Sequence, residues 1–146
     1  MQDVIDRSMA EASESTRHMF EDLIWNGDEV ISFVNSVRTA TIATANRDGL
    51  PHAAVAIAAC VDEHIHFTVT SSSIMARNLA DRPQMAFSVV YADKAIMGQG
   101  TAVLLGRSGE LEDLVDALAA SNYGGFTPPG WDGLLYRVDM RRVFTG

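Results

Sequence analysis

The stretch that decides the fold is residues 38–70, which read RTATIATANRDGLPHAAVAIAACVDEHIHFTVT. Small and β-branched residues fill positions 39–44, 51–60 and 64–70, a composition that is typical of β-strands. Polar turns at positions 46–49 and 62–63 separate these segments. Segments joined by such short turns predict consecutive antiparallel hairpins, because a parallel pair needs a much longer crossover connection.

The sequence on either side of this stretch adds helices and further strands. Apolar residues at helical spacing predict a helix over residues 28–37, with Asn26 or Asp28 as its cap. C-terminal to the hairpins we expect a short helix at 74–80, strands at 84–91 and 95–105, an amphipathic helix at 110–121 and a final strand at 134–144. Six strands in so short a chain predict a mainly β protein, a six-stranded antiparallel barrel with flanking helices.

Length and composition indicate one soluble domain. The 146 residues suffice for one hydrophobic core, which we assign to residues 28–146, preceded by a helical N-terminal extension over residues 1–27. No apolar run is long enough for a membrane helix, and the polar start is not typical of a signal peptide. The lone Cys60 cannot form an internal disulfide. We therefore expect a cytoplasmic protein with no membrane partner.

The net charge of −8 is concentrated near the N-terminus, where residues 1–29 hold eight acidic residues against two arginines. An acidic chain without a basic stripe repels phosphate backbones, so no nucleic-acid partner is expected. Lys94 is the only lysine, so an anionic ligand would have to be bound mainly by arginine, hydroxyl groups and backbone N–H groups.

Five short motifs between Arg38 and Leu105 carry a family resemblance. They are RTATIAT at 38–44, DGLPH at 48–52, FT at 67–68, SIMARNL at 73–79 with Pro83, and GTAVLL at 100–105. In order and spacing the chain resembles the pyridoxamine 5'-phosphate oxidase-like FMN-binding split barrels. The resemblance implies a six-stranded split barrel, a homodimer, and FMN bound between the two subunits.

The resemblance also implies a binding site for the FMN phosphate. In such proteins an arginine on the first strand and a Ser/Thr-Arg-Lys stretch at the start of the short helix hold the phosphate. Arg38 matches the arginine, which makes it the expected main cationic contact, and Ser73 matches the helix-opening hydroxyl. Independently of the family, a helix N-terminus preceded by serines favours an anion. The complete set of cofactor-binding residues that we predict is Arg38, Thr41, Ile42, Phe67, Thr68, Ser72, Ser73, Met75, Arg77 and Lys94.

The chain departs from the family pattern at two places. Ile74 and Met75 stand where relatives commonly have arginine and lysine, so two charge-assisted contacts to phosphate are missing. We expect the substitution Met75→Lys to restore one of them and to tighten FMN binding. The chain also has no histidine after His66, whereas pyridoxamine 5'-phosphate oxidases end in a basic, histidine-bearing segment that binds substrate.

Together these features predict an FMN-dependent oxidoreductase that acts on a small molecule, with the substrate and the catalytic residues left open. The alternatives are a flavin-binding electron carrier and a barrel that binds F420 or haem or has lost its cofactor. His64 and His66 share one strand face with Cys60 across a turn, yet no fourth zinc ligand has convincing spacing, and a haem-ligating histidine stays an alternative. Trp131 is either a lid over a ligand or a packed aromatic.

Overall fold

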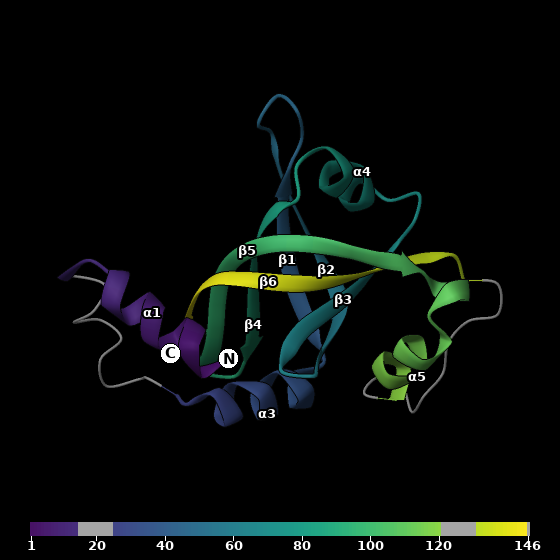
Figure 1. Ribbon diagram of the computed structural model, residues 1–146. Helices are drawn as coiled ribbons and strands as arrows, with labels where there is room; N and C mark the ends of the chain where they lie inside the picture. Colours follow the sequence, from purple (N-terminus) through teal and green to yellow (C-terminus); the bar gives the residue numbers. More distant parts are fainter. Residues whose placement is uncertain (15–24, 121–130, 146) are drawn as a thin grey trace.

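Six antiparallel strands close into a barrel in the computed structural model, which describes residues 1–14, 25–120 and 131–145 (Figure 1). Around the barrel the strand order is β1-β2-β3-β6-β5-β4. This confirms the predicted fold class, and the strand ends differ from the predicted ones by at most two residues. The strands are β1 (Thr39–Ala45), β2 (Pro51–Val61), β3 (His64–Thr70), β4 (Gln84–Tyr91), β5 (Lys94–Arg107) and β6 (Gly133–Thr145).

The helices lie around the barrel, and two of them, α3 and α4, lie at its opposite ends (Figure 1). Asn26 begins α3 with a capping box: its Oδ1 accepts from the Glu29 N–H at 2.9 Å, while Glu29 Oε2 accepts from the Asn26 N–H at 3.3 Å. Asn26 is therefore the cap, rather than Asp28. Within the described ranges the helices are α1 (Gln2–Glu11), α3 (Gly27–Val37), α4 (Ile74–Asp81) and α5 (Glu112–Ala120), the last preceded by the 3-10 turn η1 (Ser108–Glu110).

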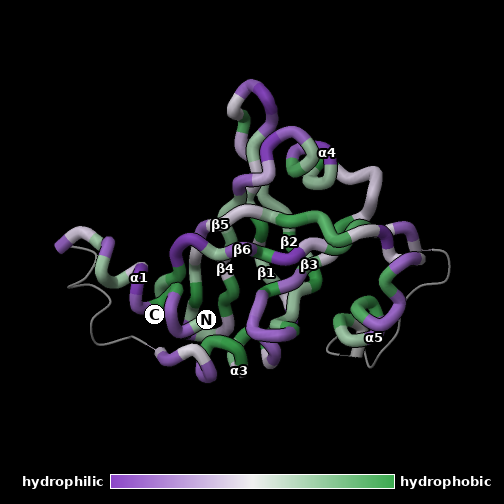
Figure 2. The backbone as a smooth tube through the Cα atoms, in the orientation of Figure 1, coloured by the Kyte–Doolittle hydropathy of each residue, from purple (hydrophilic) through white to green (hydrophobic). Residues whose placement is uncertain are grey.

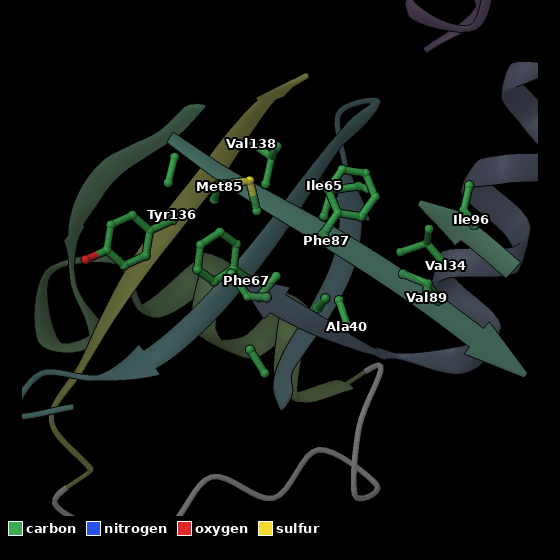
Figure 3. Close-up of a cluster of buried hydrophobic side chains, with 14 of the residues drawn as sticks. Val34, Ala40, Ile65, Phe67, Met85, Phe87, Val89, Ile96, Tyr136 and Val138 are labelled. Atoms are coloured by element: carbon green, nitrogen blue, oxygen red, sulfur yellow. The ribbon is translucent and has the colours of Figure 1, made fainter. Parts of the chain in front are cut away.

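The hydrophobic core fills the inside of the barrel. Phe67 and Tyr136 stack in it with ring centroids 5.0 Å apart and an interplanar angle of 11° (Figure 3). Val34 of α3 is fully buried and extends this core below the strands. Hydrophobic residues recur along the strands and in α3, with hydrophilic stretches in β6, whereas the β1–β2 turn is hydrophilic (Figure 2). Burial of this apolar surface is the main force that stabilises the barrel.

The N-terminal helix α1 covers an edge of β6. In the described residues β3 pairs with β6 only as far as Arg137, so the part of β6 beyond it has β5 alone as a ladder partner. Ser8 Oγ accepts from the Val143 N–H at 2.8 Å, and Arg7 Nη2 donates to the carbonyls of Met140 and Arg141 at 3.0 Å. These bonds satisfy backbone groups that a free strand edge would expose. The remainder of the predicted extension, residues 15–24, lies outside the described residues.

The β5–β6 ladder contains a close backbone approach at two glycines. Its register shifts between Gln99 and Gly100, which leaves Arg141 unmatched. At Gly98 an added Cβ would clash with the Arg142 carbonyl oxygen and lie 2.7 Å from Cζ of Phe87. Only a residue without a side chain leaves room for both neighbours at this position.

Candidate functional site

The turn between β3 and α4, Ser71–Ser73, holds two of the predicted site residues, Ser72 and Ser73, and α4 carries two more, Met75 and Arg77. We call Ser71–Ser73 the serine turn. Ser73 caps α4, since its Oγ accepts from the Ala76 N–H at 3.1 Å. Ser72 is exposed, and so is Arg77 one helical turn further on, on the same face as Ser73. Hydroxyls, the N–H groups of a first helical turn and a guanidinium are donor types that together suit an anion.

The serine turn is tied to the start of β6 and the end of β5. Ser71 Oγ donates to Asp132 Oδ2 at 2.7 Å, and the Ser71 N–H donates to the Asp132 carbonyl oxygen at 3.1 Å. Arg107 Nη1 donates to both carboxylate oxygens of Asp132, at 3.2 and 3.3 Å. The Ser71 hydrogen bond, together with the charge of Arg107, holds the pKa of the Asp132 carboxyl below its usual value. Neither Arg107 nor Asp132 was predicted as a site residue.

The other end of α4 is fixed against the β1–β2 hairpin. The buried Asn78 donates through Nδ2 to the buried Thr44 Oγ1 at 3.1 Å. Arg47 Nη2 pairs with Asp81 Oδ1 at 2.9 Å, and Arg82 Nη2 donates to the Arg47 carbonyl at 2.7 Å. The hydrogen bond from Arg47 lowers the pKa of the Asp81 carboxyl. These contacts orient α4, and thereby set where its N-terminus points.

Three of the predicted cofactor residues have their side chains in the core. Ile42 and Phe67 are 0% exposed and Met75 is 3% exposed. A cofactor at the surface could meet these residues only through their backbone. For Met75 this overturns the expectation that Met75→Lys would tighten FMN binding, because the new ammonium would be buried rather than aimed at an anion. The neighbouring Ile74, 55% exposed, is the outward position at the start of α4.

We therefore expect the substitution Ile74→Lys, rather than Met75→Lys, to tighten FMN binding. A lysine beside the phosphate adds a charge-assisted contact, and in an exposed position it is worth about 1 kcal/mol, roughly fivefold in Kd. Fluorescence titration of FMN measures the change, with Ile74→Gln as the uncharged control. Met75→Lys should instead lower the thermal midpoint. Equal FMN affinities for Ile74→Lys and Ile74→Gln would place the phosphate elsewhere.

The remaining predicted residues lie away from the serine turn. Arg38 ends α3 in a left-handed conformation, φ 72°, and α3 and α4 lie at opposite ends of the barrel (Figure 1). Lys94 is exposed at the β4–β5 turn, where it borders an open hollow of about 450 Å³ beside Trp25 and Phe33. Thr41 is exposed on the outside of β1, and Thr68 is half-buried on the outside of β3. The structure thus does not bring Arg38 or Lys94 together with Ser73.

The histidines of β3 and Cys60 do not form a metal centre, since no group of three such ligands occurs in the part of the chain that the structure describes. His64 is exposed, whereas His66 is buried, and burial lowers its pKa. Burial also raises the pKa of Cys60 to about 12, which keeps its thiol protonated. Trp131 packs its ring against Gly133, in agreement with the packed alternative rather than a lid.

The closed six-stranded topology, with α4 opening at the serine turn, defines a split barrel. Residues 27–141 match the family pattern of pyridoxamine 5'-phosphate oxidase. The chain belongs to this family, as the motifs between residues 38 and 105 led us to expect. No curated protein sequence matches it. No helix among the described residues is long and apolar enough to cross a membrane.

Several solved structures share this fold. The conserved hypothetical protein Rv2991 from Mycobacterium tuberculosis has a TM-score of 0.73 at 24% identity, covering 85% of this chain and 86% of that one. HutZ, the haem storage protein from Vibrio cholerae, has a TM-score of 0.65 at 20% identity, with coverages of 80% and 92%. An F420 reductase has a TM-score of 0.64 at 22% identity, with coverages of 77% and 93%. At these identities the likeness establishes the fold alone.

Proposed function

We propose that this protein is a homodimeric, cytoplasmic FMN-binding oxidoreductase of small molecules. The observation that carries the proposal is the serine turn at the start of α4, in a chain of the pyridoxamine 5'-phosphate oxidase family. Its hydroxyls, its helix N–H groups and the exposed Arg77 are the donor types that a terminal phosphate needs. When bound, FMN supplies hydride transfer, and the chain holds the phosphate and orients the ring.

The proposed dimer would form through the outer face of β2, β1, β4 and β5. Register places Val55 beside Thr41, Thr41 beside Ser88, and Ser88 beside Met97, in one row across these strands. Val55 is 71% exposed, and Val90 on the same face is 59% exposed. A contiguous apolar and small-residue face of this kind marks an interaction surface, and a second copy is the partner that the family relation supports.

The substitution Val55→Asp should dissociate this dimer. A carboxylate in the middle of the row would be buried without a cation to pair with, at a cost of several kcal/mol across the two copies. Sedimentation equilibrium or light scattering should then give the monomer mass of 15.8 kDa at concentrations where the unmodified protein is dimeric. Leu50→Asp is the matched control, because Leu50 is equally exposed but sits beside the β1–β2 turn. A dimer unaffected by Val55→Asp would place the interface on another face.

The test of the proposed function is a titration of the purified protein with FMN and with riboflavin. FMN fluorescence should change on binding, and riboflavin should bind at least tenfold more weakly because it lacks the phosphate. An absorption spectrum of the protein as purified separates the alternatives, since haem gives a Soret band. A protein that neither carries nor takes up FMN would refute the proposal.

F420 is the second candidate, favoured by the exposed Ile74. FMN ends in a phosphate monoester with close to two negative charges, whereas the phosphate of F420 is a diester with only one. Ile74, at the start of α4, stands where the family pattern has a cation, and a phosphate with a single charge needs less compensation. Tighter binding of F420 than of FMN in the same titration would select this candidate.

A further inference from the structure

We propose that Asp132 is a built-in competitor for the phosphate, whose carboxylate occupies the Ser71 hydroxyl of the serine turn and the guanidinium of Arg107 until a ligand phosphate displaces it. The inference rests on the proposed function and adds to it a residue that determines phosphate affinity. Asp132 would act on the phosphate of the ligand and not on the reacting flavin ring. It is therefore proposed as a specificity-determining residue rather than a catalytic one.

The bonds of Asp132 are those that a phosphate oxygen would make. One carboxylate oxygen accepts from the Ser71 hydroxyl at 2.7 Å, and both accept from Arg107 Nη1 at 3.2 and 3.3 Å. A hydroxyl and a guanidinium are common phosphate ligands in proteins. The carboxylate therefore uses a donor of the serine turn itself, together with the guanidinium of Arg107.

Displacement of the carboxylate would leave the turn intact. The Asp132 backbone carbonyl separately accepts from the Ser71 N–H at 3.1 Å, and Ser73 still caps α4. The side chains of Arg107 and Asp132 are 60% and 59% exposed, and ion pairs at such exposure are weak. The Asp132 side chain can thus rotate into solvent while its backbone keeps the turn in place.

The charges of Asp132 and Arg107 explain why displacement of the carboxylate would determine how tightly the phosphate binds. With its carboxylate ionised, Asp132 cancels the charge of Arg107 and repels an approaching phosphate. Once the side chain has rotated away, Arg107 and the Ser71 hydroxyl become available to the phosphate. With an uncharged residue at position 132, Arg107 and the Ser71 hydroxyl would be available to the phosphate without this exchange. The substitution Asp132→Asn keeps the shape of the side chain and removes its charge.

The experiment is a fluorescence titration of FMN and riboflavin against the full chain and four variants. Asp132→Asn should bind FMN about five- to tenfold more tightly, as removal of one like charge near a surface site would give, with riboflavin unchanged. Arg107→Gln should weaken FMN several-fold, and in the double variant the gain from Asp132→Asn should disappear. Asp139→Asn is the matched control, because Asp139 also pairs with an arginine, at 3.0 Å, but on the β6 strand itself. Circular dichroism confirms that each variant folds.

Each outcome of the titration either supports or overturns the inference. A gain confined to FMN and to Asp132→Asn supports the inference, and so does FMN binding that appears in this variant alone. Unchanged FMN affinity in Asp132→Asn, with binding by the unmodified protein, overturns the inference and leaves the proposed function standing. An equal gain for riboflavin, or an equal gain in Asp139→Asn, also overturns it. If no variant binds FMN, the inference and the proposed function are both refuted.

Discussion

Replacement of Phe67 by alanine is expected to lower the free energy of unfolding by about 3–5 kcal/mol, the usual range for a phenylalanine truncated in a core. Phe67 is fully buried and stacks on Tyr136, and its neighbours in the barrel are held by the strand ladders. They cannot collapse into the space that the ring leaves, so the cavity adds to the lost burial. Denaturation by urea, followed by circular dichroism, measures the change.

The adjacent Thr68 provides the control for this experiment. It lies on the opposite face of β3, half-buried, so Thr68→Ala should cost about 1 kcal/mol or less. The pair also tests whether Phe67 is a core residue rather than the surface cofactor contact that its place in the predicted site implied. A loss below about 1 kcal/mol for Phe67→Ala, within the range of surface substitutions, would show that the ring is not a core element.

Replacement of Gly98 by alanine should cost about 3 kcal/mol, at the upper end of the usual overpacking range. The new methyl would lie 2.7 Å from Cζ of Phe87 and would clash with the carbonyl oxygen of Arg142. The backbone oxygen cannot rotate away, so β5 and β6 would have to separate locally. The thermal midpoint and the urea midpoint should both fall.

Gly109 in the turn η1 is the matched control for Gly98. A Cβ there would have no atom within 4 Å, so Gly109→Ala should leave the free energy of unfolding within about 0.5 kcal/mol of its original value. If Gly98→Ala and Gly109→Ala behaved alike, the close approach of β5 and β6 would not be a constraint on the fold.

The fold could be predicted because its signals are local. Hairpin turns such as Asn46–Gly49 and the β-strand composition of the segments between them indicated the number and order of the elements. The choice between Asn26 and Asp28 as helix cap could not be made, because both residues suit an N-cap and only the geometry of Glu29 decides. The way in which α1 docks could not be predicted either, because the hydrogen bond from the Val143 N–H to Ser8 Oγ joins residues 135 positions apart in the sequence.

The candidate site was predicted less completely because side-chain direction and long-range pairing matter there. The serine turn and Ser73 followed from helix-capping rules. The sequence did not reveal that Met75 points into the core and Ile74 outward. A shift of one residue along a helix moves a side chain to a different face, so the two positions are easily exchanged. Arg107 and Asp132 carry no motif, and they meet only because β5 ends where β6 begins.

The position of β6 between β3 and β5 has a consequence for how the protein folds during synthesis. Residues 133–145 pair with both neighbours, so the barrel cannot close until this strand has emerged from the ribosome. Until then β3 and β5 each expose an edge, and α1 lacks the edge of β6 that it covers. Such non-local pairing gives a high contact order and slow folding. The nascent chain should therefore depend on chaperones more than its modest size suggests, because its unpaired strands stay open to aggregation while translation continues.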